Sequence, residues 1–386
     1  VYIMQIIATM QGPLPYTKVE SGQYSVGYDN EETAWKAMMD DLDYSIGVLT
    51  ALMNTDPSFN ELTTEDRIYQ GDYKKWIKFA NSLKLRIAIR ISNAVPEYAQ
   101  EKAEEAVSHP YGVMDSNDCD AYDNITATNY KNGLASVNSW GEVRANACIV
   151  SFMNGYQDPR CEAYFTKSSV SGDYDYIGVR SGIQGITTSM FSTYSTVKVE
   201  TKTPMLIFNA AEVAFLRAEG ALKKWNMGGT AEEFYKEGIR LSFNEHGISG
   251  ADAYIANNTN VPADYICPLN AAYNYTNPCK LTVAWDKTGA NADEDNLQRI
   301  LTQKMIANFP IGNETWADFR RTGYPAVFPA HDNLSTQGVT KERQQRRLRF
   351  SEDEYNSNGA NVTEACTFLS NGQDTDATDL WWAKKD

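Results

Sequence analysis

Histidine is scarce in this chain of 386 residues, and the cysteines are scattered. There are only three histidines, and none of the six cysteines belongs to a Cys-x-x-Cys pair. Because zinc sites are built from closely spaced Cys and His ligands, the sequence gives no support for a metal site of that kind. Cys267 and Cys279 bracket a short loop and could form a disulfide, but two unpaired thiols are the interpretation we favour.

Long apolar runs are absent, and positive charge is in deficit. No apolar stretch approaches the roughly 20 residues that a helix needs to span a bilayer. Lys and Arg number 35 against 50 Asp and Glu, which gives a net charge of −15. Nucleic acid is therefore a poor partner, because neutralising its phosphates takes an excess of Lys and Arg.

The catalytic motifs that spacing can reveal are missing as well. The chain has no Gly-x-Ser-x-Gly elbow, no Gly-x-Gly-x-x-Gly or Walker loop, and no His-Glu-x-x-His helix. A pair of glycosidase carboxylates leaves no such motif, since it is defined by a separation of about 5–10 Å across a cleft. Solvated helix faces account for most of the acidic residues. We therefore predict a protein that is not an enzyme.

One run between residues 114 and 124 concentrates oxygen ligands. Such ligands suit calcium, a hard cation. The residues are Asp115, Asn117, Asp118, Asp120 and Asp123. The glycine and the terminal glutamate of an EF-hand loop are missing, so we interpret the run as a polar turn after a helix. A calcium site is the alternative, and no other cofactor is predicted.

What the chain does have is helical periodicity. Apolar residues recur at three- and four-residue steps behind capping residues, which is typical of amphipathic helices. We predict helices over 31–53, 72–93, 204–224 and 231–246. Thr203 is placed as the cap of the third and Pro204 in its first turn. Further helices are predicted after Pro96 and in the stretches DNLQRILTQKMIANFP and NETWADFRRTGYP.

Loop-rich segments interrupt these helices. Residues 110–203 and 249–291 are rich in Gly, Ser, Asn, Asp and Tyr and show weak periodicity, and the tail 326–386 is polar and mostly irregular. Trp381 and Trp382 are interpreted as packing the C-terminus against the core. Paired amphipathic helices with alanines at contact points predict a mostly α fold, an α-solenoid of tetratricopeptide-like helix pairs with large insertions.

Five stretches, in this order along the chain, resemble the SusD/RagB family of outer-membrane nutrient-binding lipoproteins. They are GPLPYTKV (12–19), WIKFANSLKLRIAIRI (76–91), AAEVAFLRAEGAL (210–222), QKMIANFPIGNETWADFRRTGYP (303–325) and RRLRFSEDEYNSN (346–358). YQDPRCEAYF (156–165) resembles the SusD-like branch. The family's lipidated cysteine and first helices are absent, and VYIMQIIATM resembles the end of an apolar helix. We therefore expect a chain truncated or processed upstream, with its lipid anchor in the missing part.

The resemblance implies one SusD-like domain over 1–386. It would consist of helical blocks 1–109 and 204–325, insertions 110–203 and 249–291, and the tail 326–386. It also implies a lipoprotein at the outer face of the outer membrane, which captures a nutrient, usually a glycan, and passes it to a SusC-like TonB-dependent transporter. The helix over 72–93 would then be a scaffold helix. Its Asn81, Arg86 and Arg90 are expected to bond buried carbonyls and carboxylates such as Glu212 or Glu219.

Sugar-binding residues are expected among the aromatic and polar residues of the insertions. A pyranose stacks its C–H face on Trp or Tyr, while its hydroxyls bond Asn, Asp and Arg. The candidates are Tyr130, Asn138, Trp140, Arg144, Tyr273, Tyr275 and Trp285, with Tyr122 and Asn132 in the same stretch as the first four. No motif of the family carries over to these positions one by one, so local packing is an equal alternative for each.

Two other functions stay open from the sequence. A RagB-like protein would bind peptides in place of glycans. A pure scaffold would only gate its transporter and have no ligand site of its own. An exposed group of aromatic side chains beside amides favours the glycan, a deep groove with unpaired backbone edges favours the peptide, and the lack of exposed aromatics favours the scaffold.

Overall fold

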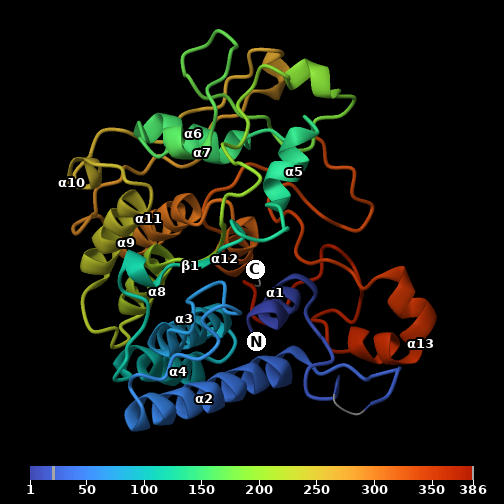
Figure 1. The fold of residues 1–386 in the computed structure, drawn as a ribbon. Coiled ribbons are helices and arrows are strands. Elements are labelled where there is room, and N and C mark those ends of the chain that lie inside the picture. The colour runs from blue at the N-terminus through green and yellow to red at the C-terminus, as the bar shows by residue number, and fades with distance from the viewer. Residues whose placement is uncertain (20–21, 385–386) are drawn as a thin grey trace.

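The computed structural model describes residues 1–19 and 22–384, and it is mostly helical (Figure 1). The helices of the two helical blocks and the tail are α1 (Tyr2–Gln11), α2 (Glu31–Thr55), α3 (Tyr73–Ile91), α4 (Pro96–Ser108), α8 (Ala210–Leu222), α9 (Ala231–Glu245), α11 (Ala292–Ala307), α12 (Gly312–Thr322) and α13 (Glu352–Cys366). The elements of the insertions are η2 (Asn117–Cys119), β1 (Ala121–Asp123), α5 (Gly133–Ser139), α6 (Ala147–Tyr156), α7 (Cys161–Tyr164), η3 (Thr188–Phe191), β2 (Met205–Phe208), α10 (Ala251–Ile255) and η4 (Ala271–Tyr273).

The long helices form pairs. Helix α3 packs between α2 and α4, and α8 packs against α9 and α11. In Figure 1 the helices α2, α3 and α4, coloured from blue to teal, lie at the bottom. Helices α8, α9 and α11 follow above them, and the loop-rich segment with α5, α6 and α7 covers the top. This arrangement confirms the predicted α fold, with paired helices that carry large insertions.

The predicted helix over 204–224 is wrong in its first turn. Residues 205–208 form strand β2, which pairs antiparallel with β1, and helix α8 begins only at Ala210. The cap is Asn209, whose side chain accepts a hydrogen bond from the backbone N–H of Glu212 at 2.9 Å. The sequence Met-Leu-Ile-Phe suits a strand, and the asparagine after it offers a stronger cap than Thr203.

The tail is less irregular than predicted, because it contains helix α13. Ser351 caps this helix by accepting a hydrogen bond from the N–H of Glu354 at 3.3 Å, and the helix kinks at Asn358. Only Val362 and Ala365 of the helix are buried. Two buried positions in fifteen residues leave almost no apolar stripe for sequence periodicity to detect.

Buried ion pairs connect the scaffold helices. Arg86 of α3 donates two hydrogen bonds to Glu212 of α8, at 2.9 and 2.8 Å, as expected. Arg90 pairs with Glu314 of α12, and Glu219 takes Arg321 as its partner. The two arginines of α3 therefore bind α8 and α12, a third pair joins α8 to α12 directly, and every one of these side chains is buried.

Two further expectations concern α3 and the cysteines. Asn81, which is buried, donates its amide to the carbonyl oxygen of Gly112 at 2.9 Å; it bonds a backbone carbonyl as predicted, although that carbonyl belongs to a partly buried residue. Cys267 and Cys279 are both buried and both free. The favoured interpretation of two unpaired thiols is confirmed.

Candidate functional site

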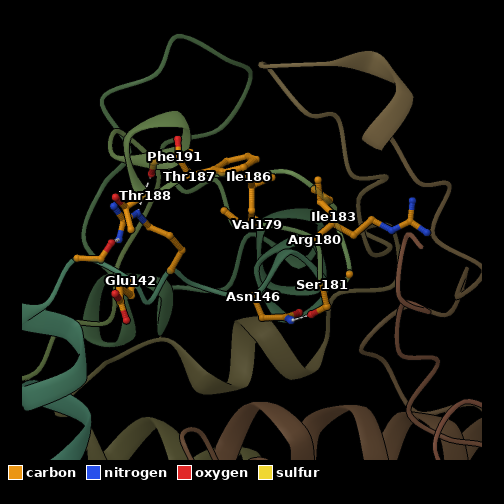
Figure 2. A pocket seen from close by; sticks show the side chains of 13 residues that line it. Glu142, Asn146, Val179, Arg180, Ser181, Ile183, Ile186, Thr187, Thr188 and Phe191 are labelled. Atoms are coloured by element: carbon orange, nitrogen blue, oxygen red, sulfur yellow. Dashed lines mark hydrogen bonds between the residues drawn. The ribbon is translucent and has the colours of Figure 1, made fainter. Parts of the chain in front are cut away.

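The loop-rich cap above the helices contains a hollow of about 390 Å³ (Figure 2), which we call the cap pocket. Its walls come from the turn after α5 and from the segment that leads into η3. The lining residues are Gly141, Glu142, Arg144, Asn146, Val179, Arg180, Ser181, Gly182, Ile183, Ile186, Thr187, Thr188 and Phe191. Two parts of the chain about forty residues apart thus enclose one space.

Two glycines give these loops their shape. Gly141 has a φ of 75° in the turn after α5, a conformation that L side chains rarely adopt. Gly182 has a φ of 82°, and a β-carbon there would lie 2.7 Å from the side chain of Ala330. Larger residues at either position would strain or displace the loops that form the pocket.

Arg144 is held in a fixed orientation at the pocket wall. Its Nε donates to the carbonyl oxygen of Phe191 at 2.7 Å, and its Nη1 donates to those of Gly141 and Val143 at 2.7 and 2.8 Å. Among the described residues its Nη2 has no hydrogen-bond partner, and no carboxylate pairs with it. The guanidinium therefore connects the two walls, and Nη2 is its one nitrogen without a bond to the described protein.

The pocket has an apolar side and a polar side. Figure 2 shows Val179, Ile183, Ile186 and Phe191 as apolar lining, with Asn146 below them. Asn146 donates its amide to the Ser181 hydroxyl at 3.1 Å. Apolar surface beside amides and hydroxyls suits a ligand that has an apolar face and many hydroxyls, which is the character of a sugar ring.

An exposed tryptophan stands next to this pocket. Trp140 is 66% exposed and directly precedes Gly141, which lines the pocket. Its backbone N–H caps the end of α5 by donating to Val137 at 3.2 Å, so its position is fixed by the helix end while its indole stays in solvent. Of the sequence candidates, Arg144 thus lines the cap pocket, and Trp140 lies one residue before its first lining residue, Gly141.

Tyr273 and Tyr275 lie behind the pocket wall. Arg180 extends away from Thr187 and Thr188 in Figure 2, and its guanidinium lies 4.6 Å from the centre of the Tyr275 ring. Tyr275 also packs against Phe328, and Tyr273 packs edge-on against His331. Both rings have protein neighbours, so they support the wall and do not line the pocket.

Three other candidates lie outside the cap pocket. Trp285 packs against Tyr235 of α9, with ring centres 5.3 Å apart. Asn138 donates its amide to the carbonyl oxygen of Val197 at 3.1 Å, which ties α5 to the neighbouring loop. Tyr130 is 62% exposed and lies against the guanidinium of Arg67. None of the three lines the cap pocket.

A second, smaller hollow of about 160 Å³ adjoins the cap pocket. Residues 176–178 line it, and the next residues along the chain, 179–183, line the cap pocket. Tyr174 lines the smaller hollow and is largely exposed. One continuous segment, 176–183, therefore contributes to both hollows.

The residues that sequence reasoning missed are those of the segment 179–191. It contributes isoleucines, hydroxyls and Phe191 to the pocket, but it contains no tryptophan or tyrosine. The segment therefore lacks the residue types, Trp and Tyr, from which stacking sites were predicted. Its sequence gives only weak signals of a pocket-forming loop. They are two glycines at short spacing and Ile186, which is exposed in the structure.

The acidic side chains of residues 114–124 form ion pairs and hydrogen bonds with other parts of the protein. Three of its acids pair with cations: Asp115 with Lys78 at 2.6 Å, Asp118 with Lys75 at 3.0 Å and Asp123 with Arg67 at 2.6 Å. Asp120 accepts a hydrogen bond from the N–H of Ala210 at 2.7 Å, and burial raises its pKa to about 6. No group of three or more His, Cys, Asp or Glu side chains within 1–19 and 22–384 is arranged to hold a metal ion.

Comparison with known proteins identifies the family. The family model described as Susd and RagB outer membrane lipoprotein matches residues 1–383. The chain belongs to the SusD-like family. A search of curated proteins gave no match. Among the helices of the described residues, none has the length and apolar character needed to cross a membrane.

Solved SusD-like structures are similar over almost the whole chain. A SusD-like protein from Bacteroides thetaiotaomicron is 48% identical with a TM-score of 0.94, and the match covers 99% of this chain and 79% of that one. A chitin-binding SusD homolog from Flavobacterium johnsoniae is 38% identical with a TM-score of 0.93 and the same coverage. A SusD homolog from Bacteroides uniformis is 41% identical with a TM-score of 0.89, again over 99% and 79%. The SusD-like fold expected from the sequence is confirmed.

Proposed function

We propose that this SusD-like protein is a non-catalytic glycan-binding protein at the outer face of the outer membrane. It captures oligosaccharides in its loop-rich cap and delivers them to a SusC-like TonB-dependent transporter. The observation that carries the proposal is the exposed side chain of Trp140, the residue directly before Gly141 in the lining of the cap pocket. The chitin-binding homolog, 38% identical over 99% of this chain, supports a glycan as the class of ligand.

The geometry supplies the parts that sugar binding needs. The flat indole of Trp140 can take the C–H face of a pyranose, while Arg144 Nη2 and the hydroxyls of Thr187 and Thr188 can bond the ring's hydroxyls. Arg144 is already fixed by three carbonyl oxygens, so little side-chain entropy is lost when a ligand binds. The adjoining hollow beside Tyr174 extends the surface for a second sugar unit.

Nothing in the pocket resembles a hydrolase centre. Among the residues that the structure describes, Glu142 is the only acid that lines the cap pocket. Glycoside hydrolysis by the usual route needs two carboxyl groups on opposite sides of the scissile bond. The arrangement supports binding and release of the intact ligand.

Replacing Trp140 with alanine should weaken glycan binding about ten- to hundredfold, because a stacking platform is worth roughly 1–3 kcal/mol. Stability should change little, since the exposed indole buries little area in the free protein. Isothermal titration with oligosaccharides and thermal melting of the same variant measure the two effects.

Tyr130→Ala is the matched control, because Tyr130 is similarly exposed in the same insertion, but its ring lies against Arg67 and neither it nor its neighbours in the chain line the cap pocket. It should bind glycan like the parent protein. A large loss of melting temperature in Trp140→Ala with unchanged affinity would contradict the proposed site. Binding of peptides in place of glycans would favour the RagB-like alternative, and binding of neither would favour the scaffold alternative.

A further inference from the structure

A larger hollow, of about 560 Å³, lies apart from the cap pocket and shares no residue with it. It lies where the insertion meets the helices: α1, strand β2, the end of α9 and the link from α11 to α12 all reach it. We call it the Glu245 pocket. Its lining includes Tyr2, Tyr122, Leu134, Tyr164, Leu206, Glu245, His246, Phe309 and Ile311.

Glu245 is a carboxyl group without a counter-charge. It accepts hydrogen bonds from the Tyr122 hydroxyl and from the Asn209 amide, the latter at 3.0 Å. No Lys, Arg or His of the described residues lies within ion-pair distance of it. Burial, and then the nearby charge of Asp120, raises the pKa of Glu245 to about 8. A partly buried carboxyl group without a counter-charge would be stabilised in its ionised form by an incoming cation.

Part of the pocket wall is aromatic and apolar, and Asn132, Thr203 and Asn313 contribute polar groups. Tyr164 stacks on Phe309 with ring centres 5.0 Å apart, and Tyr2 and Tyr122 add two more rings. The negative faces of such rings attract cations, most strongly where water is excluded. Leu134, Leu206 and Ile311 provide apolar surface for the rest of a ligand.

The other titratable groups at the pocket do not supply the missing positive charge. Burial lowers the pKa of His246 to about 4, so its imidazole is neutral. Lys198 is exposed, and its ammonium donates to the carbonyl oxygen of Glu162 at 3.1 Å. Arg160 is nearby but is bound to Asp158, with Nη2 and Oδ2 2.6 Å apart.

We propose that the Glu245 pocket is a second binding site, which takes a small alkyl- or arylalkyl-ammonium ion. The ammonium group pairs with the Glu245 carboxylate among the tyrosine rings, and the apolar body lies against the leucine and isoleucine side chains. The site is independent of the proposed glycan site, so no glycan is needed to detect it.

The test compares three probes of matched size by isothermal titration, at a pH above the Glu245 pKa of about 8. The probes are 2-phenylethylammonium, 2-phenylethanol and 3-phenylpropanoate. The ammonium ion should bind at one site, at least about tenfold more tightly than the alcohol or the anion. Equal binding of the alcohol, or no saturable binding of the ammonium ion, overturns the proposal.

Two variants locate the site. Glu245→Gln keeps the size and both hydrogen-bonding neighbours but removes the charge, and it should lose about tenfold in affinity for the ammonium ion. Glu200→Gln is the control, because it removes one exposed acid from the segment that borders the pocket and should change nothing. Ile311→Trp should fill the pocket and so weaken binding of the ammonium ion. It provides the test if Glu245→Gln does not fold. Unchanged binding in a folded Glu245→Gln or Ile311→Trp variant overturns the assignment.

Discussion

Replacing Arg86 with alanine should lower the free energy of unfolding by about 3–5 kcal/mol. The arginine donates two hydrogen bonds to Glu212, and the two side chains are only 1% and 0% exposed. Removing the guanidinium leaves the Glu212 carboxylate buried, and within the described part of the chain Lys304, at 3.5 Å, is then its one cationic neighbour within ion-pair distance. That lysine is already bound to Asp318 at 2.9 Å, so it compensates only in part. Urea unfolding followed by circular dichroism measures the loss.

Arg67→Ala is the matched control for this prediction. Arg67 binds Asp123 in the same two-bonded manner, at 2.6 and 2.8 Å, but at the surface. Water replaces the partner of an exposed charge, so the loss should be small. If both variants lose the same free energy of unfolding, burial is not the reason why the Arg86–Glu212 pair between α3 and α8 stabilises the fold.

Replacing Trp382 with alanine should cost about 3–5 kcal/mol of stability. Its indole is fully buried near the C-terminus. The guanidinium groups of Arg320 and Arg90 lie 4.9 and 5.3 Å from its ring centre. Arg320 is itself buried and donates a hydrogen bond to the carbonyl oxygen of Thr9 at 2.7 Å. The cavity left by the indole would therefore also weaken the contact between α12 and α1. Thermal unfolding followed by calorimetry records the change.

Trp381→Ala provides the comparison for Trp382→Ala. Trp381 is only partly buried, and the bond that fixes it runs from its backbone N–H to Glu31 at 2.9 Å, which alanine keeps. The neighbouring variant should therefore lose clearly less stability. A Trp382→Ala protein that melts like the parent would contradict the view that this residue packs the C-terminus into the core.

Helices with a buried stripe were predictable from the sequence, and elements without one were not. Helix α3 buries almost its whole second half, so its apolar spacing and its cap Asp72 predict it well. Strand β2 looks like the first turn of α8, because its four apolar residues fit either structure, and only its pairing with β1 decides. Helix α13 is mostly exposed, so its sequence resembles that of a loop.

The candidate site was predictable only in part, for a related reason. Trp140 and Arg144 could be picked out because they are four residues apart in a loop-rich stretch with the right side-chain chemistry. Their partner segment, 179–191, reaches them through turns at Gly141 and Gly182, and such a contact has no period in the sequence. Trp285 has the same chemistry as Trp140 but packs on Tyr235, because loops also bury aromatic rings.

The most direct test of the central claim is calorimetric titration of the purified protein with a panel of oligosaccharides, followed by chromatography of the recovered ligand. The account predicts saturable binding of at least one glycan, weakened about ten- to hundredfold by Trp140→Ala, with the ligand recovered at its original length. Failure of every glycan to bind would contradict the proposed function. Shortened products would also contradict it if substituting a single carboxylate abolished their release, because such a result would show that the protein is an enzyme.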